Sequence, residues 1–327
     1  MGIFNNESAK LIIRELARKN NCEKEITKEL EWLSRSCYLE PLFVYSEIIK
    51  ELKKSFIAIN ISGSIGYLLT ANLLGISDIN PKDYNLPYCF FKAFKNVFTE
   101  FKISVDSSKY NQAKTILENT LNKMGCRCSF IGHQCFADVA YEVRLIWLSP
   151  SNTLKHISKC AEPTNINLND IPFGDKKAIE YMLERDDQGY KNLDDAQLPK
   201  FIAKHDYMRQ FTPDTYFEFA RVYSLIFGNV RYRKDFFTET LCDVDVNIEE
   251  VYNRLTNTYD ISSVDAIRLI YDLYHRERYT ESDGLVLATH QVREDLLHNF
   301  NTMSGCLLKA LQDVILYYKL AYIKTHS

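Results

Sequence analysis

The chain has 327 residues, of which 46% are hydrophobic and 25% are charged, and its formal net charge at neutral pH is −3. This composition is typical of a folded protein with a large core and two or three subdomains, and it excludes a fibrous or wholly disordered chain. The small negative charge neither favours nor excludes a nucleic-acid partner, because a basic channel can coexist with an acidic surface elsewhere.

Apolar residues recur at helical spacing near the start of the chain, for example at Leu11, Ile12 and Leu16. The pattern predicts helices over 7–19, 23–34 and 41–54. No apolar run approaches the roughly 20 residues that a membrane helix needs, and the first residues lack a signal-peptide pattern. We therefore expect a cytoplasmic protein with no membrane partner.

An apolar strand predicted over 56–61 runs into a turn of small residues, which opens onto a helix predicted over 64–74. Backbone N–H groups at such a junction can hold a phosphate, because glycine allows close approach and the helix dipole favours negative charge. The candidate phosphate-binding residues are Gly63, Ser64 and Gly66. The alternative is a tight turn that needs two glycines to enter a helix.

Further strands are predicted over 102–105, 126–131 and 141–148. A long helix over 110–124, together with the helix at 64–74, is expected to cover one face of the resulting sheet. Beyond Pro150 the pattern becomes helical almost throughout. The later helices are predicted over 176–185, from 213 onward, and over 247–256, 262–274, 282–299 and 305–323.

Nine cysteines invite a metal interpretation. The densest group of soft ligands comprises Cys126, Cys128, His133 and Cys135. These four could form a structural zinc clip, although their spacing differs from that of ordinary zinc knuckles. Alternation instead favours a strand with both earlier cysteines on one face, a turn at Gly132 and a returning strand from Gln134, which makes the thiols free and buried.

A basic cluster offers the best candidate for nucleic-acid contact. It comprises Arg231, Arg233 and Lys234, with Tyr232 between the two arginines. Arginines interleaved with an aromatic ring can pair with phosphates and stack on bases. The alternative is a solvated loop that follows the preceding helix.

Five segments carry a resemblance that no single motif would support. The Gly-Ser turn continues into Leu-Gly-Ile-Ser at 74–77 and Asn80-Pro81, and four more segments follow it in order: KISVDSS at 102–108, IPFGDKK at 171–177, FEFARVYSLIFG at 217–228 and LAYIKTH at 320–326. In this order they resemble the palm and fingers of bacterial C-family replicative DNA polymerases, the PolC type of DNA polymerase III α subunit. The chain looks like a palm-and-fingers fragment of such an enzyme.

The resemblance implies an α+β fold, with a polymerase-β-like nucleotidyltransferase palm followed by a mostly helical fingers-like region. It divides the chain into a helical scaffold at 1–54, a palm-like domain at 55–160 and a fingers-like domain at 161–327. Only 40 residues separate Asp106 from Ile146, whereas the family places a large helical thumb between its two acidic strands. We therefore expect a reduced thumb.

The departures from the family fall on its catalytic positions. Lys102 and Ser104 stand where two acids are expected, Ile146 stands where the third acid is expected, and Asp106 is the sole retained acid. Nucleotidyl transfer uses carboxylates to hold two Mg²⁺ ions. Ser62 also replaces an arginine that would contact a triphosphate.

Two functions follow from this pattern. In the first, the protein is a catalytically inactive module that binds DNA, a nucleoside triphosphate or a replisome protein, and no cofactor is expected. In the alternative, it is a divergent Mg²⁺-dependent nucleotidyltransferase that combines Asp106 with relocated acids. The candidates for those acids are Asp78, Asp83 and Asp138.

Overall fold

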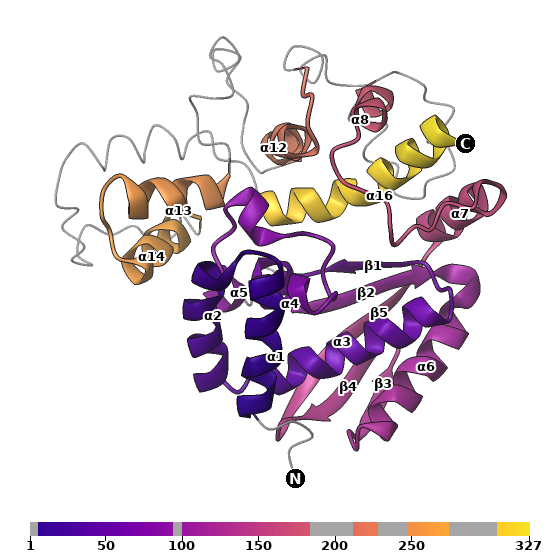
Figure 1. Ribbon diagram of the computed structural model, residues 1–327, viewed down its shortest axis with the longest axis horizontal. Coiled ribbons are helices and arrows are strands. Elements are labelled where there is room, and N and C mark those ends of the chain that lie inside the picture. The colour runs from indigo at the N-terminus through magenta and orange to yellow at the C-terminus, as the bar shows by residue number, and fades with distance from the viewer. Residues whose placement is uncertain (1–5, 94–99, 184–211, 228–246, 275–305) are drawn as a thin grey trace.

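The computed structural model describes residues 6–93, 100–183, 212–227, 247–274 and 306–327 (Figure 1). They form a mixed α+β fold, in which helices pack against a five-stranded sheet with the strand order β1-β2-β5-β4-β3. Among these residues, no helix combines the length and the apolar character that crossing a bilayer requires.

The sheet contains both parallel and antiparallel pairs. Its strands are β1 (Ile59–Ser62), β2 (Phe101–Asp106), β3 (Cys128–Ile131), β4 (Gln134–Val139) and β5 (Glu142–Ser151). Strands β2 and β5 run parallel in the centre, and β1, β4 and β3 pair antiparallel to their neighbours. Short turns join β3 to β4 and β4 to β5, as is usual for antiparallel hairpins.

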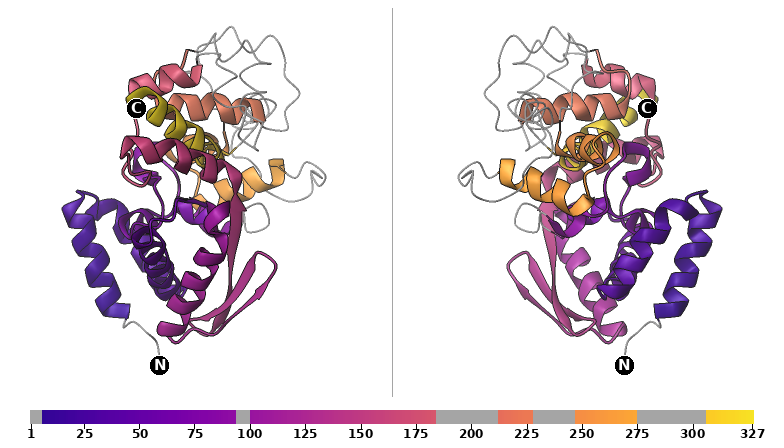
Figure 2. Two further views of the ribbon diagram at one scale, coloured as in Figure 1. Left: turned by 90° about the vertical axis from the view of Figure 1, so that its right-hand side faces the viewer. Right: turned by 90° about the vertical axis from the view of Figure 1, so that its left-hand side faces the viewer.

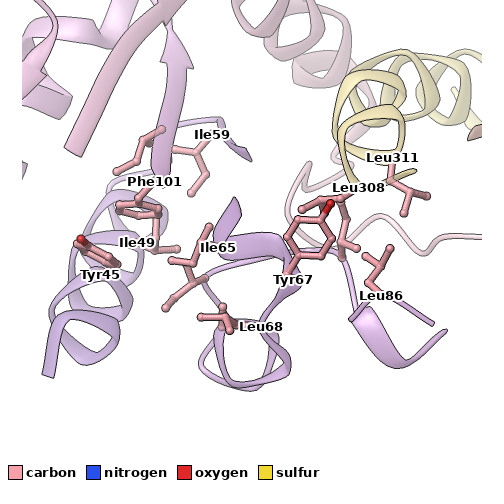
Figure 3. Packing of buried hydrophobic residues seen from close by; sticks show 14 of the residues in the cluster. Tyr45, Ile49, Ile59, Ile65, Tyr67, Leu68, Leu86, Phe101, Leu308 and Leu311 are labelled. Carbon is pink, nitrogen blue, oxygen red and sulfur yellow. The ribbon is translucent and has the colours of Figure 1, made fainter. Parts of the chain in front are cut away.

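One face of the sheet is closed by helices. Helices α3 (Leu39–Lys54) and α6 (Tyr110–Lys123) pack together on this face, beyond which lie α1 (Asn6–Lys19) and α2 (Glu23–Arg35) (Figure 1). The ring of Tyr45 in α3 stacks on Phe101 in β2 with centroids 4.2 Å apart (Figure 3). Burial of such aromatic and aliphatic side chains supplies most of the stabilisation.

The long last helix connects the sheet to the later helices. Helix α16 (Leu307–His326) packs against α8 (Lys176–Leu183), α12 (Tyr216–Phe227), α7 (Asn152–Ala161) and strand β1. Helices α13 (Ile248–Asn257) and α14 (Ser263–Tyr274) pack on each other to one side (Figure 1). Figure 3 shows Tyr67 and Leu86 close to Leu308 and Leu311 of α16.

Short helical segments lie between the longer elements. They are the 3₁₀ turns η1 (Ser64–Tyr67), η2 (Pro81–Tyr84), η3 (Ser107–Lys109) and η4 (Glu162–Thr164), and the helices α4 (Leu69–Leu73) and α5 (Phe90–Ala93).

The predicted helix over 64–74 is therefore wrong in two respects. The chain forms a 3₁₀ turn and then the separate helix α4, since Leu68 between them has an extended backbone. Helix α4 packs on α1, α2 and α3. The place on the sheet that we expected for the helix over 64–74 is occupied by α3. The predicted helix over 282–299 lies outside the described residues.

Candidate functional site

Asp106 ends strand β2 and serves as a cap for the helical turn that follows. Its Oδ1 accepts hydrogen bonds from the backbone N–H of Ser108 at 2.8 Å and from the Ser108 hydroxyl at 2.6 Å. The side chain is 3% exposed. Asp and Ser favour this arrangement because a short polar side chain can satisfy a helix N-terminal N–H group. The carboxylate is thus engaged within its own loop.

The sheet register identifies the neighbours of Asp106 on the same face. Lys102, Ser104 and Asp106 alternate with core residues along β2, and β5 places Trp147 beside Lys102 and Ser149 beside Ser104. The hydroxyl oxygens of Ser104 and Ser149 are 3.1 Å apart and hydrogen bonded. A two-metal polymerase site needs several acids on such a strand pair. Here the face presents two serines and one lysine beside Asp106.

Ile146, which the sequence placed at the position of the third acid, does not lie on the same face as Asp106. Ile146 pairs with Phe101 on the closed face of the sheet, and both side chains are fully buried. Since side chains alternate along a strand, Ile146 points away from Asp106. Ser149 is the residue of β5 beside Ser104, and it carries no charge either.

The three candidate relocated acids lie apart from Asp106. Asp78 forms an ion pair with the buried Lys319 of α16, with 2.9 Å between Oδ2 and Nζ. Asp83 is exposed in η2, where the adjacent Lys82 pairs with Glu25 of α2. This pairing directs the turn toward the N-terminal helices.

Asp138 is at the opposite end of the sheet from Asp106. It pairs with Val143 at the start of β5, while Asp106 pairs with Ser151 at its end. At about 3.3 Å per residue, the two carboxylates are roughly 25 Å apart. In the part of the chain that the structure describes, no three or more His, Cys, Asp or Glu side chains gather so as to hold a metal ion.

The Gly-Ser turn is packed against helix α16. Gly63 has a positive φ of 107°, which favours glycine, and it leads into η1. The Gly63 N–H donates to Gln312 Oε1 at 3.1 Å, and the Gln312 amide donates back to Gly63 O at 2.9 Å. Ser64 and Gly66 are buried.

Two further backbone groups of the turn are also engaged. Ile65 N–H donates to Glu100 O at 3.1 Å, and Gly66 N–H donates to Gly63 O at 3.2 Å. A Cβ atom on Gly66 would lie 2.6 Å from Leu308 Cδ1. The glycine is therefore needed for close packing, and phosphate binding here stays a prediction that requires α16 to move away.

The cysteine cluster forms a hairpin, as the alternation predicted. Strands β3 and β4 pair with Cys128 opposite Ala137 and Phe130 opposite Cys135. Burial raises the pKa of Cys135 to about 12 and also raises that of Cys126 and Cys128, which opposes the thiolate form that zinc requires. His133 is hydrogen bonded to Tyr110 at 2.9 Å. Among the residues that the structure describes, the four side chains do not gather into a group that could hold a metal ion, so the zinc clip stays a prediction.

One buried glutamate has a role that the sequence did not indicate. Glu249 accepts hydrogen bonds from Leu307 N, Leu308 N and the Tyr67 hydroxyl, at 2.9, 3.1 and 2.8 Å. It therefore caps the N-terminus of α16 from a distant helix. Burial raises the pKa of the Glu249 carboxyl. No local spacing signals this contact, because the two partners are far apart in the chain.

Near this cap lies a pocket of about 330 Å³. Glu250 in its lining pairs with Arg221, which lies outside the lining, at 2.6 Å. Its lining consists of Tyr84, Asn85, Phe217, Glu249, Glu250, Asn253, Arg254, Asn257, Thr258 and Leu307. The pocket therefore presents two glutamates, one arginine and several amides, and no group of three or more metal ligands gathers among the described residues.

The basic cluster at Arg231, Arg233 and Lys234 lies outside the described residues, so its role in DNA binding stays a prediction. The division into scaffold, palm-like and fingers-like domains likewise stays a prediction. No family model matches this chain, and no curated protein matches it.

Proposed function

We propose that this protein is a catalytically inactive, polymerase-like module of the PolC type that binds DNA without extending it. The observation that carries this proposal is the composition of the central strand pair. Beside Asp106, the same face presents Lys102, Ser104 and Ser149. Two-metal phosphoryl transfer needs several carboxylates around its ions, and an ammonium group on this face repels Mg²⁺.

The engagement of Asp106 supports the same proposal. Its Oδ1 already accepts two hydrogen bonds from Ser108, and Asp78 is committed to Lys319. An enzyme would need at least a second acid within bridging distance of Asp106. Without this pair of acids, the face offers a surface for DNA or for a replisome protein and lacks the groups for phosphoryl transfer.

The proposal is tested by measuring binding and extension on the same DNA. Fluorescence anisotropy with labelled primer–template and single-stranded DNA measures binding, and a gel assay with deoxynucleotides and Mg²⁺ or Mn²⁺ measures extension. We expect binding without extension. Extension that is present in the wild type and absent in Asp106→Asn would contradict the proposal, since asparagine retains the cap but loses the charge.

A further inference from the structure

The second face of the sheet differs from the closed face in having side chains without partners. Figure 2 shows α1, α2 and α3 on one side of the sheet, while no helix of the described residues covers the lower part of the other side. The partly buried apolar side chains on this open face lie outside the main core. They are Leu145, Trp147 and Phe136.

One row of this face crosses all five strands. The register joins Ser62 of β1 to Lys102 of β2, Lys102 to Trp147 of β5, Trp147 to Gln134 of β4, and Gln134 to Ile131 of β3. Since residues paired in a ladder project to the same side, these five side chains lie next to one another. The row therefore places an ammonium group directly beside an indole ring.

Two side chains of this row, Lys102 and Trp147, lack polar or aromatic partners within the described part of the chain. The Lys102 ammonium has no ion pair or hydrogen bond there, and Trp147 has no ring contact. Trp32, the other tryptophan, is by contrast packed among Tyr38, Tyr88 and Phe91. The indole ring of Trp147 can stack on a base, and the neighbouring ammonium group of Lys102 can pair with a phosphate.

The neighbouring rows extend this surface in two directions. Phe136 is the diagonal neighbour of Trp147 on the adjacent strand, and such neighbours are about 7–8 Å apart, so one extended strand of nucleic acid reaches both rings. On the other side stand the partly buried hydroxyls of Ser104 and Ser149, and the open surface ends at Asn60, which is buried beside Ser104. The Asn60 Oδ1 is buried and has no hydrogen-bond partner among the described residues.

We infer that this open face, centred on Trp147 and Lys102, binds single-stranded DNA by base stacking and phosphate pairing; this inference rests on the proposed function. Bases stack on aromatic side chains of open sheets without needing a particular sequence. Lys102 supplies positive charge for the backbone, whereas Asp138 places one exposed carboxylate farther along the same face. Duplex DNA would bind less tightly here, because its bases are stacked on one another and cannot lie on the rings.

The test uses the full chain and an unlabelled dT12 strand. In a Trp32→Phe background, Trp147 is the sole tryptophan, and its fluorescence should be quenched as dT12 is added. Trp147→Leu should weaken binding about tenfold, and Trp147→Phe should retain most of it because a ring remains. Thermal melts of each variant confirm that it is folded.

Two variants that each remove one positive charge, Lys102→Gln and Lys123→Gln, test the role of Lys102. Lys102→Gln should weaken binding and lower the salt dependence of log K by about 0.7, the value for one phosphate contact on a single strand. Lys123→Gln, on the exposed side of α6, should change neither quantity. A dU12 strand and an rU12 strand tell whether the sugar matters, and binding of both through Trp147 supports the inference.

Three outcomes would overturn the inference. Tight dT12 binding that is unchanged in Trp147→Leu and Lys102→Gln would place the strand elsewhere, while the proposed function would stand. Absence of binding to any DNA would contradict both this inference and the proposed function. A dimer by sedimentation that dissociates in Trp147→Leu would show that a second copy of the chain covers this face.

Discussion

The side-chain amide of Gln312 forms two hydrogen bonds with the backbone of Gly63, although 249 residues separate the two. Gln312 lies in the second turn of the last helix, and Gly63 directly follows the first strand. These bonds hold α16 against the Gly-Ser turn. The turn that resembles a phosphate-binding loop therefore forms a packing contact here.

Gly66→Ala tests this joint. The new Cβ would lie 2.6 Å from Leu308 Cδ1 and 2.7 Å from Gln312 Nε2. Both side chains are buried, so we expect a loss of about 1–3 kcal/mol in the free energy of unfolding, measured by urea denaturation. Adding Leu308→Ala should recover part of the Gly66→Ala effect, and strict additivity of the two changes would contradict the close contact.

Glu29 should make stability depend on pH. Its carboxylate accepts from Leu69 N and Thr70 N at 3.0 and 2.7 Å, and burial raises its pKa to about 7. Between its ordinary value of 4.5 and about 7, the folded protein holds a proton that the unfolded chain has released. Stability therefore falls as pH rises through this window, by about 3 kcal/mol.

Glu29→Gln isolates that effect, because the amide does not titrate. Urea denaturation at pH 5 and pH 8 should show a smaller difference for Glu29→Gln than for the wild type. The exposed Glu31→Gln, on the same helix, is the matched control and should keep the wild-type difference. Equal pH dependence in Glu29→Gln and the wild type would contradict the account.

Glu249→Ala should destabilise the start of α16. The change leaves the N–H groups of Leu307 and Leu308 and the Tyr67 hydroxyl without their buried acceptor. Unsatisfied buried donors are costly, so we expect a loss of about 3 kcal/mol in thermal or urea denaturation. Glu249→Gln should lose less, because its carbonyl oxygen still accepts. Equal losses in the two variants would show that the charge itself matters.

Asp106 offers a test that separates a cap from a metal ligand. Asp106→Ala removes the acceptor of both Ser108 bonds and should cost about 1 kcal/mol of stability. Asp106→Asn keeps an oxygen in the same place and should be nearly as stable as the wild type. If the two variants lost stability equally, the capping role would be wrong.

Local patterns predicted most of the secondary structure. Helical spacing placed α1 and α2 within a residue of their observed ends, and the alternation around Cys128 predicted the β3–β4 hairpin with its turn at Gly132. The helix over 247–256 was also predicted, and the structure shows the Asn247 side chain capping α13 by accepting from Glu250 N at 2.9 Å. These features depend on neighbours in the chain, so the sequence contains them directly.

The features that decide the candidate site depend on distant partners. Motif comparison placed Ile146 in a catalytic position, but the β2–β5 register turned it to the closed face. The pairing of Gly63 with Gln312 joins segments far apart in sequence and has no local signature. A register slip of one residue reverses the face of every side chain, which is why motif spacing alone could not place these groups.

Calorimetry of a nucleoside triphosphate, with and without Mg²⁺, measures whether the face around Asp106 still holds a metal-dependent nucleotide site. The wild type and Asp106→Asn are titrated with dATP under both conditions. With Lys102 and Ser104 in place of acids, the account predicts no Mg²⁺-dependent binding in either protein. Tight Mg²⁺-dependent binding to the wild type that is lost in Asp106→Asn would contradict the account and identify a working nucleotidyltransferase site.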